Sequence, residues 1–91
     1  MKLSQEILDQ VQDLAGRYMT PRAIAIIIGV DEDDFRDELE DEDSQVYKHF
    51  YRGLYMTEAE LQGAIIRLAK QGSSPAQALA LKLQQDAKTS M

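Results

Sequence analysis

Apolar residues recur at alternating spacings of three and four through the middle of the chain, and this pattern restricts its fold more than any other feature. The residues that follow the pattern are Tyr47, Phe50, Leu54, Thr57, Leu61, Ala64 and Leu68. Such spacing keeps one face of an α-helix in register for about six turns. We therefore predict one long amphipathic helix within residues 44–71.

Two local signals favour a break in this helix near Met56. A capping-box pattern joins Thr57 to Glu60, and Gly53 stands where a helix interior would be expected. The continuity of the apolar face favours one unbroken or bent helix instead.

A second helix is expected to follow at once. The long helix ends at Gln71-Gly72, and Ser74-Pro75 has the residue types that begin a helix. Four residues share the apolar face of this helix: Ala76, Leu79, Ala80 and Leu83. We predict an antiparallel helical hairpin over residues 44–88, with a frayed tail at residues 89–91.

The first 43 residues have the pattern of a tri-helical helix-turn-helix unit. A helix over Ser4–Ala15 carries Ile7, Leu8, Val11 and Leu14 on one face, and the next helix carries Ile24, Ala25 and Ile28. Thr20-Pro21 begins the second helix and Gly29 ends it, after which Asp31 can cap a third helix with Phe35 and Leu39 inward. The fold class predicted is all-α, a tri-helical unit followed by the hairpin.

Residues 31–43 are strongly acidic, although they include the helix that would read DNA in a helix-turn-helix protein. They contain ten acidic side chains and one base, Arg36. Several of the acids repeat at a spacing of four, which places like charges next to each other and is mildly destabilising. This block would repel a polyanion, because groove contacts lie well within the screening length at physiological salt.

Seven of the nine remaining bases are the candidates for DNA contact. We assign this role to Lys2, Arg17, Arg22, Lys48, Arg52, Arg67 and Lys70. The alternative is a face that docks on a basic protein, formed by Asp33, Asp34, Asp37, Glu38, Glu40 and Asp41. A third interpretation is simply a solvated acidic surface that keeps a small protein soluble.

Length and composition limit the remaining possibilities. A chain of 91 residues has room for one core, and without cysteine it forms no disulfide or thiolate metal site. The N-terminal ten residues lack an apolar run, so we expect no signal peptide or membrane span and a cytoplasmic location. We predict no cofactor and no enzymatic activity, because no nucleophile motif or phosphate-binding glycine loop surrounds the single histidine, His49.

A calcium-binding loop is a weaker interpretation of the acidic block. Asp31, Asp33 and Glu42 match three ligand positions of an EF-hand loop. Phe35 and Arg36 occupy the fifth and sixth positions, where a ligand and a glycine are needed. We predict no metal site.

Four apolar or aromatic residues are candidates for an interface. Ile26 and Ile27 occupy positions that are normally polar and exposed, so we expect either the hairpin or a partner subunit to cover them. Tyr51 and Tyr55 continue a row that begins at Tyr47, beside basic residues, and favour core or interface packing over base stacking. We expect a homo-oligomer.

The segment PRAIAIIIGVDEDDF resembles the helix-turn-helix superfamily pattern, and YKHFYRGLYMTEAELQGAIIRLAKQGSSPAQALALKLQ resembles small phage and prophage proteins of the terminase small-subunit type. This resemblance implies a non-enzymatic protein with a DNA-binding head and an oligomerising hairpin. Such a protein would recognise packaging-site DNA and recruit the ATP-driven large subunit. The positions implied to read bases are Glu32, Asp33, Arg36 and Asp37, whose acidity argues against direct readout.

The leading hypothesis is therefore a phage-type DNA-associated adaptor whose acidic third helix does not read DNA. The alternative is a protein-interaction module or DNA mimic that docks this helix on a basic partner.

Overall fold

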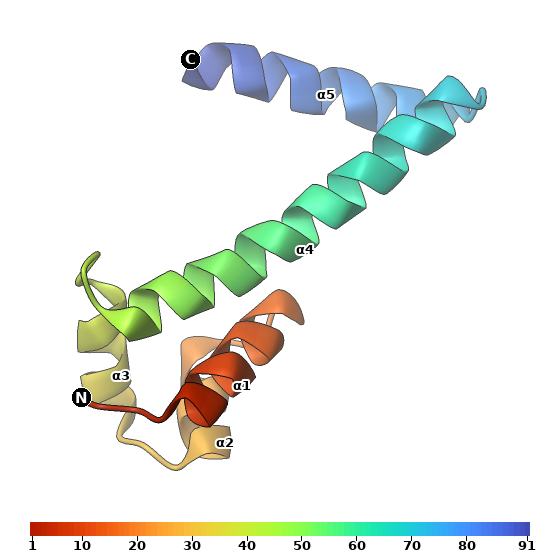
Figure 1. Cartoon of the computed structure of the whole chain (residues 1–91). Helices are drawn as coiled ribbons and strands as arrows, with labels where there is room; N and C mark the ends of the chain where they lie inside the picture. The colour runs from red at the N-terminus through yellow and green to blue at the C-terminus, as the bar shows by residue number, and fades with distance from the viewer. The chain divides into compact units, whose positions relative to one another are not determined.

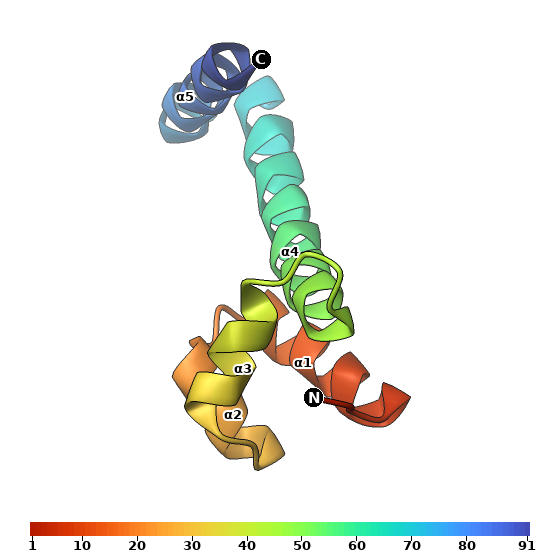
Figure 2. The ribbon, with the colours of Figure 1, turned by 90° about the vertical axis from the view of Figure 1, so that its left-hand side faces the viewer.

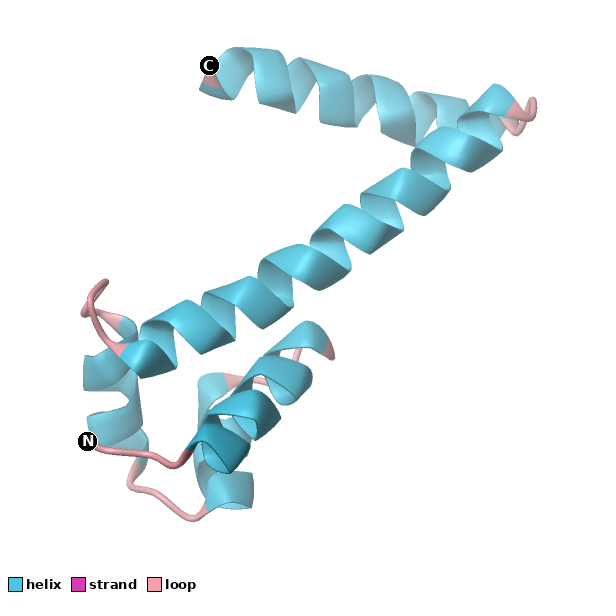
Figure 3. Ribbon diagram, viewed as in Figure 1, coloured by secondary structure: helices cyan, strands magenta, loops and turns pink.

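Five helices connected by short turns make up the computed structural model, which describes all of residues 1–91 (Figures 1 and 3). They are α1 (Gln5–Gly16), α2 (Pro21–Ile28), α3 (Glu32–Leu39), α4 (Gln45–Lys70) and α5 (Ser74–Ser90). No strand is present, so the predicted all-α class is confirmed.

The chain divides into two units, Met1–Thr57 and Glu58–Met91, and α4 runs through the division. From the sequence, the boundary between the two units was predicted after residue 43 instead. The difference arises because Val46 and Phe50, at the start of α4, are only 2% and 8% exposed and belong to the core of unit 1.

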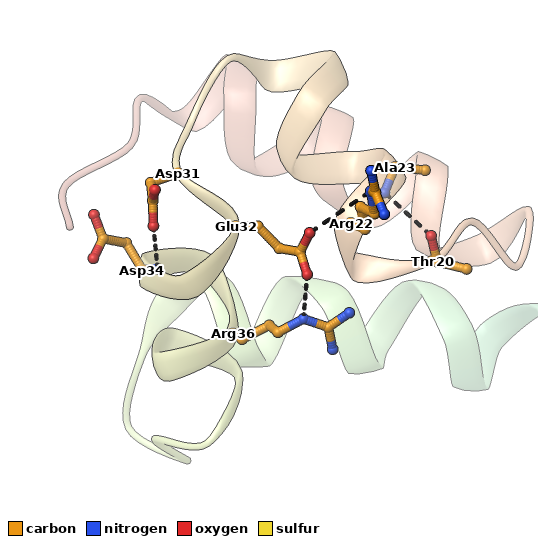
Figure 4. Close-up of polar contacts among 7 residues, drawn as sticks. All are labelled: Thr20, Arg22, Ala23, Asp31, Glu32, Asp34 and Arg36. Carbon is orange, nitrogen blue, oxygen red and sulfur yellow. Dashed lines mark hydrogen bonds and ion pairs between the residues drawn. The ribbon is translucent and has the colours of Figure 1, made fainter.

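Side-chain caps begin all three short helices of unit 1. The Ser4 hydroxyl accepts a hydrogen bond from the Ile7 amide, and the Thr20 hydroxyl accepts one from the Ala23 amide. The Asp31 carboxylate accepts from the Asp34 amide at 3.0 Å (Figure 4). Each cap satisfies an amide that has no partner within its helix, which explains why the short helices begin where they do.

The turn between α2 and α3 depends on Gly29. Its φ of 79° lies in the left-handed region, and its amide still donates to the Ala25 carbonyl. A left-handed glycine ends a helix and redirects the chain within a few residues. The α2–turn–α3 arrangement predicted for a helix-turn-helix unit is thus present (Figure 2).

The core of unit 1 is built from all four helices that enter it. Val11, Ile24, Ala25 and Phe35 are fully buried. The Phe35 ring meets the Phe50 ring edge-on, with centroids 6.5 Å apart, which ties α3 to α4. Ala15 and Val46 also belong to the buried core, although the sequence pattern did not identify either.

Helix α4 is continuous over its 26 residues and does not break near Met56. Gly53 is in α4 for a tertiary reason. A Cβ atom at this position would lie 2.0 Å from the Gln12 carbonyl oxygen, so α1 crosses α4 too closely for any side chain. The glycine that suggested a break instead marks a helix crossing.

Unit 2 consists of residues 58–70 of α4, a turn and α5. The turn uses Gly72 at φ 100°, and the Ser73 hydroxyl accepts from the Ala76 amide to cap α5. The Gln77 side-chain amide donates to the Ala69 carbonyl at 3.1 Å. The predicted hairpin is confirmed, and α5 continues to Ser90, through part of the tail expected to fray.

Candidate functional site

Helix α3 presents most of its side chains to solvent. Phe35 is fully buried and Leu39 packs against the core, and these two residues attach the helix to unit 1. Asp33, Asp34 and Asp37 are exposed. The side of α3 that could face a ligand is therefore acidic, as the sequence predicted.

The single base of α3 is paired within its own helix. Arg36 Nε donates to Glu32 Oε2 at 2.9 Å, and Arg22 Nε from α2 lies 3.9 Å from Glu32 Oε1 (Figure 4). An exposed pair of this kind contributes at most about 1 kcal/mol, so DNA could displace it. The stronger obstacle to DNA is the field of the neighbouring carboxylates.

Glu38 is held inside unit 1 and is less available to a partner than the sequence suggested. The Ser44 hydroxyl donates to Glu38 Oε2 at 2.6 Å, and the Met1 ammonium donates to Oε1 at 2.9 Å. The Ser44 hydrogen bond first, and the Met1 ammonium second, lower the pKa of Glu38, although desolvation acts in the opposite direction. This carboxylate supports the junction between α3 and α4.

The remaining acids of the predicted face divide into two groups. Asp41 accepts a hydrogen bond from the Asp43 amide at 3.0 Å and so shapes the turn before α4. Four side chains are exposed and make no side-chain hydrogen bond or ion pair: Asp33, Asp34, Asp37 and Glu40. We call these four residues the free acidic face.

The structure does not support a calcium loop in this block. Residues 32–39 form a helix in place of the loop that such a site needs. No group of three or more histidine, cysteine or acidic side chains is arranged to hold a metal ion.

The candidate DNA contacts do not form one surface. Arg17 pairs with Asp13 at 3.0 Å and Arg22 lies near Glu32, whereas the other five bases make no ion pair. Arg67 and Lys70 belong to unit 2. Within unit 1, Lys48 and Arg52 are exposed and stand one helical turn apart on α4, which makes them neighbours.

A row of tyrosines lies beside these two bases on α4. The ring centroids of Tyr47 and Tyr51 are 4.6 Å apart, and those of Tyr51 and Tyr55 are 5.8 Å apart. Tyr51 packs against the core, whereas Tyr55 is 59% exposed. By helical spacing, Tyr55 adjoins Arg52 and Tyr51 adjoins Lys48.

The hydroxyl of Tyr47 remains protonated at neutral pH. Desolvation first, and the negative charge of Glu42 second, raise the pKa of Tyr47 above its ordinary value. Tyr47 therefore offers an aromatic face and a hydrogen-bond donor without a negative charge.

Ile26 and Ile27 are exposed on α2, at 68% and 47%, so unit 1 provides no cover for them.

His49 has an ordinary environment: Nδ1 lies 2.7 Å from the Gln45 carbonyl oxygen and Nε2 lies 3.3 Å from the Gln5 amide. Neither the two isoleucines nor His49 adds a chemical group to the site.

No protein-family model, curated protein or solved structure matches the chain. The resemblance to small terminase subunits therefore rests on the sequence motifs alone. None of the helices is both long enough and apolar enough to cross a membrane.

Proposed function

We propose that the chain is a non-enzymatic, phage-type DNA-associated adaptor, similar to terminase small subunits, in which α4 rather than α3 contacts DNA. The observation that carries the proposal is the pair Lys48 and Arg52. Both are exposed, neither has an ion-pair partner, and they adjoin the tyrosine row. Unpaired cations can neutralise phosphates without first breaking a protein contact.

The charge of α3 supports the same division of roles. Its first turn holds Glu32, Asp33 and Asp34, and its single base already bonds to Glu32. A helix of this kind would meet the major groove with carboxylates, which can accept only from the amino groups of cytosine and adenine and which repel the phosphates on either side. Contact through α4 would be largely independent of sequence and steeply dependent on salt.

The test is a titration of fluorescent duplex DNA with the full chain at several salt concentrations. We expect weak binding at about 50 mM salt that is lost near 200 mM. The double variant Lys48→Ala, Arg52→Ala should reduce the slope of log K against log salt by about 1.8, because each phosphate contact contributes about 0.9. Arg36→Ala is the matched control and should bind as the unmodified chain does.

Two results would contradict the proposal. One is sequence-selective, nanomolar binding that disappears with Arg36→Ala alone, because α3 would then read DNA. The other is an unchanged salt slope in the Lys48, Arg52 double variant.

A second candidate function is a protein-interaction module or DNA mimic, and the free acidic face favours it. Four unpaired carboxylates on one short segment resemble a run of phosphates and would attract a basic surface. This alternative predicts no DNA binding at low salt. It also predicts competition with duplex DNA for a basic DNA-binding protein, weakened when Asp33 and Asp37 become Asn.

A further inference from the structure

Unit 2 buries almost nothing of its own. Ala76 is its single buried residue. Five large apolar side chains are between 44% and 54% exposed: Leu61, Ile66, Leu68, Leu79 and Leu81. A two-helix segment with so little buried area does not offset the entropy of ordering its chain. Unit 2 is therefore an incomplete core that needs a further surface.

An open groove of about 690 Å³ separates α4 and α5, and Gln62, Ile66 and Ala69 line it on α4. Leu61, Ala64 and Leu68 lie on a different side of α4, at spacings of three and four. None of these three residues, which we call the distal seam, lines the groove, and Leu61 and Leu68 are about half exposed.

The distal seam has the residue spacing of a coiled coil. Leu61 and Leu68 are seven residues apart with Ala64 between them, which assigns the two leucines to position a and the alanine to position d. The neighbouring Glu60 and Arg67 both fall at position g, on the same flank of the seam. The flank therefore carries an acid at its N-terminal end and a base at its C-terminal end.

We propose that the distal seam of α4 pairs with the distal seam of a second copy of this chain, antiparallel and about a two-fold axis near Ala64. In an antiparallel pair the g positions of the two helices face each other. Glu60 of one copy would then lie beside Arg67 of the other, and the two-fold axis would create this pair twice. A leucine of one chain would also pack against the small Ala64 of the other.

The charge of unit 2 favours a second copy over a charged partner. Residues 58–91 contain four bases and three acids, whereas the excess acid of the chain lies in residues 31–43. Two copies of unit 2 therefore repel each other little. A parallel pair would place Glu60 and Arg67 opposite positions 65 and 72, where the chain has Ile65 and Gly72, and would gain no ion pair.

The first experiment measures association of the full chain by sedimentation equilibrium, from about one to several hundred micromolar, since a seam of three to four turns is small. We expect a monomer–dimer equilibrium. Glu60→Arg alone and Arg67→Glu alone should each weaken the dimer by roughly ten-fold or more, because each creates two like-charge contacts. The double variant should recover the original affinity.

The matched controls are Lys82→Glu and Asp86→Arg, which reverse one exposed charge each on α5 of the same unit. They should leave the dimer affinity within about two-fold. A chain that remains monomeric throughout the range overturns the proposal. So does a dimer that the two charge reversals weaken without recovery in the double variant.

A second experiment tests orientation and uses the absence of native cysteine. Ala64→Cys lies near the proposed axis and should form a disulfide-linked dimer under mild oxidation. Gln71→Cys lies one heptad further along and should not, because antiparallel pairing separates its two copies well beyond the roughly 7 Å Cα limit of a disulfide. Efficient linking through both positions would indicate parallel pairing and reject the two-fold arrangement. The inference does not depend on what unit 1 binds.

Discussion

Replacing Gly53 with alanine should separate α1 from α4 and destabilise unit 1. The new Cβ would lie 2.0 Å from the Gln12 carbonyl oxygen, 2.8 Å from its carbonyl carbon and 3.1 Å from its Cα. Carbon and oxygen atoms normally approach no closer than about 3.3 Å, so the helices must move apart by roughly 1 Å or more. All three atoms are backbone, and no side-chain rotation relieves the clash.

The magnitude follows from two opposing effects. Overpacking of a close contact costs about 1–3 kcal/mol and occasionally more, and this clash is at the severe end. Alanine is more favourable than glycine in a helix interior by about 1 kcal/mol, which offsets part of this cost. We expect a net loss of about 2 kcal/mol, a large part of the roughly 3–8 kcal/mol available to a unit of this size.

Gly63 provides a control in the same helix. A Cβ at this position meets nothing within 4 Å, so Gly63→Ala has the propensity gain without the clash. Urea and thermal melts followed by circular dichroism should show a melting temperature lower by about 10 °C for Gly53→Ala and not lower for Gly63→Ala. If Gly53→Ala melts at or above the unmodified chain, α1 and α4 do not cross at this distance.

Three further substitutions test the surface of unit 1. Replacing Ile26 and Ile27 by serine should change the free energy of unfolding by less than about 0.5 kcal/mol, because both are exposed; a loss of several kcal/mol in a urea melt would reveal a covering surface. Asp37→Asn should stabilise α3 by tenths of a kcal/mol in low-salt melts, since it removes the like-charge pair with Asp33 and leaves the first turn unchanged, and no gain would mean that the two carboxylates do not repel. Glu38→Gln should lower the melting temperature near pH 7, and by progressively less as the pH falls below the ordinary glutamate pKa of 4.5. A lowered pKa stabilises the fold above the unfolded pKa, and this stability is lost as the pH falls through the folded pKa. A loss that does not change with pH would rule out the charge as its cause.

Local signals predicted the helices of unit 1 well. Thr20 and Asp31 were expected to cap helices and do so, and Gly29 was expected to end α2 and does. These residues act on amides within three positions of themselves, so the sequence contains the whole interaction. The buried position of Phe35 also followed from helical spacing.

Contacts between distant residues could not be predicted in this way. Gly53 suggested a helix break because its tertiary partner, the Gln12 carbonyl, lies 41 positions earlier in the chain. The bond from Ser44 to Glu38 spans a turn and has no periodic signal, so Glu38 was grouped with the free acids. Similarly, the spacing of apolar residues in α4 is the same before and after Thr57. The spacing therefore could not predict that Phe50 is buried whereas Leu61 is half exposed.

The acidic character of α3 is compatible with a helix-turn-helix fold, because the fold depends on few of its residues. Phe35 and Leu39 attach the helix, and Asp31 caps it. Acidic side chains in the first turn interact favourably with the positive end of the helix dipole, so Asp33 and Asp34 stabilise α3. A helix that reads DNA would instead need basic or amide side chains at these positions. Selection for the fold alone therefore does not disfavour acidic residues in α3. Selection for recognition of DNA bases by this helix would disfavour them. The proposed transfer of DNA contact to Lys48 and Arg52 requires no change in the packing of unit 1, since both side chains already lie outside its core.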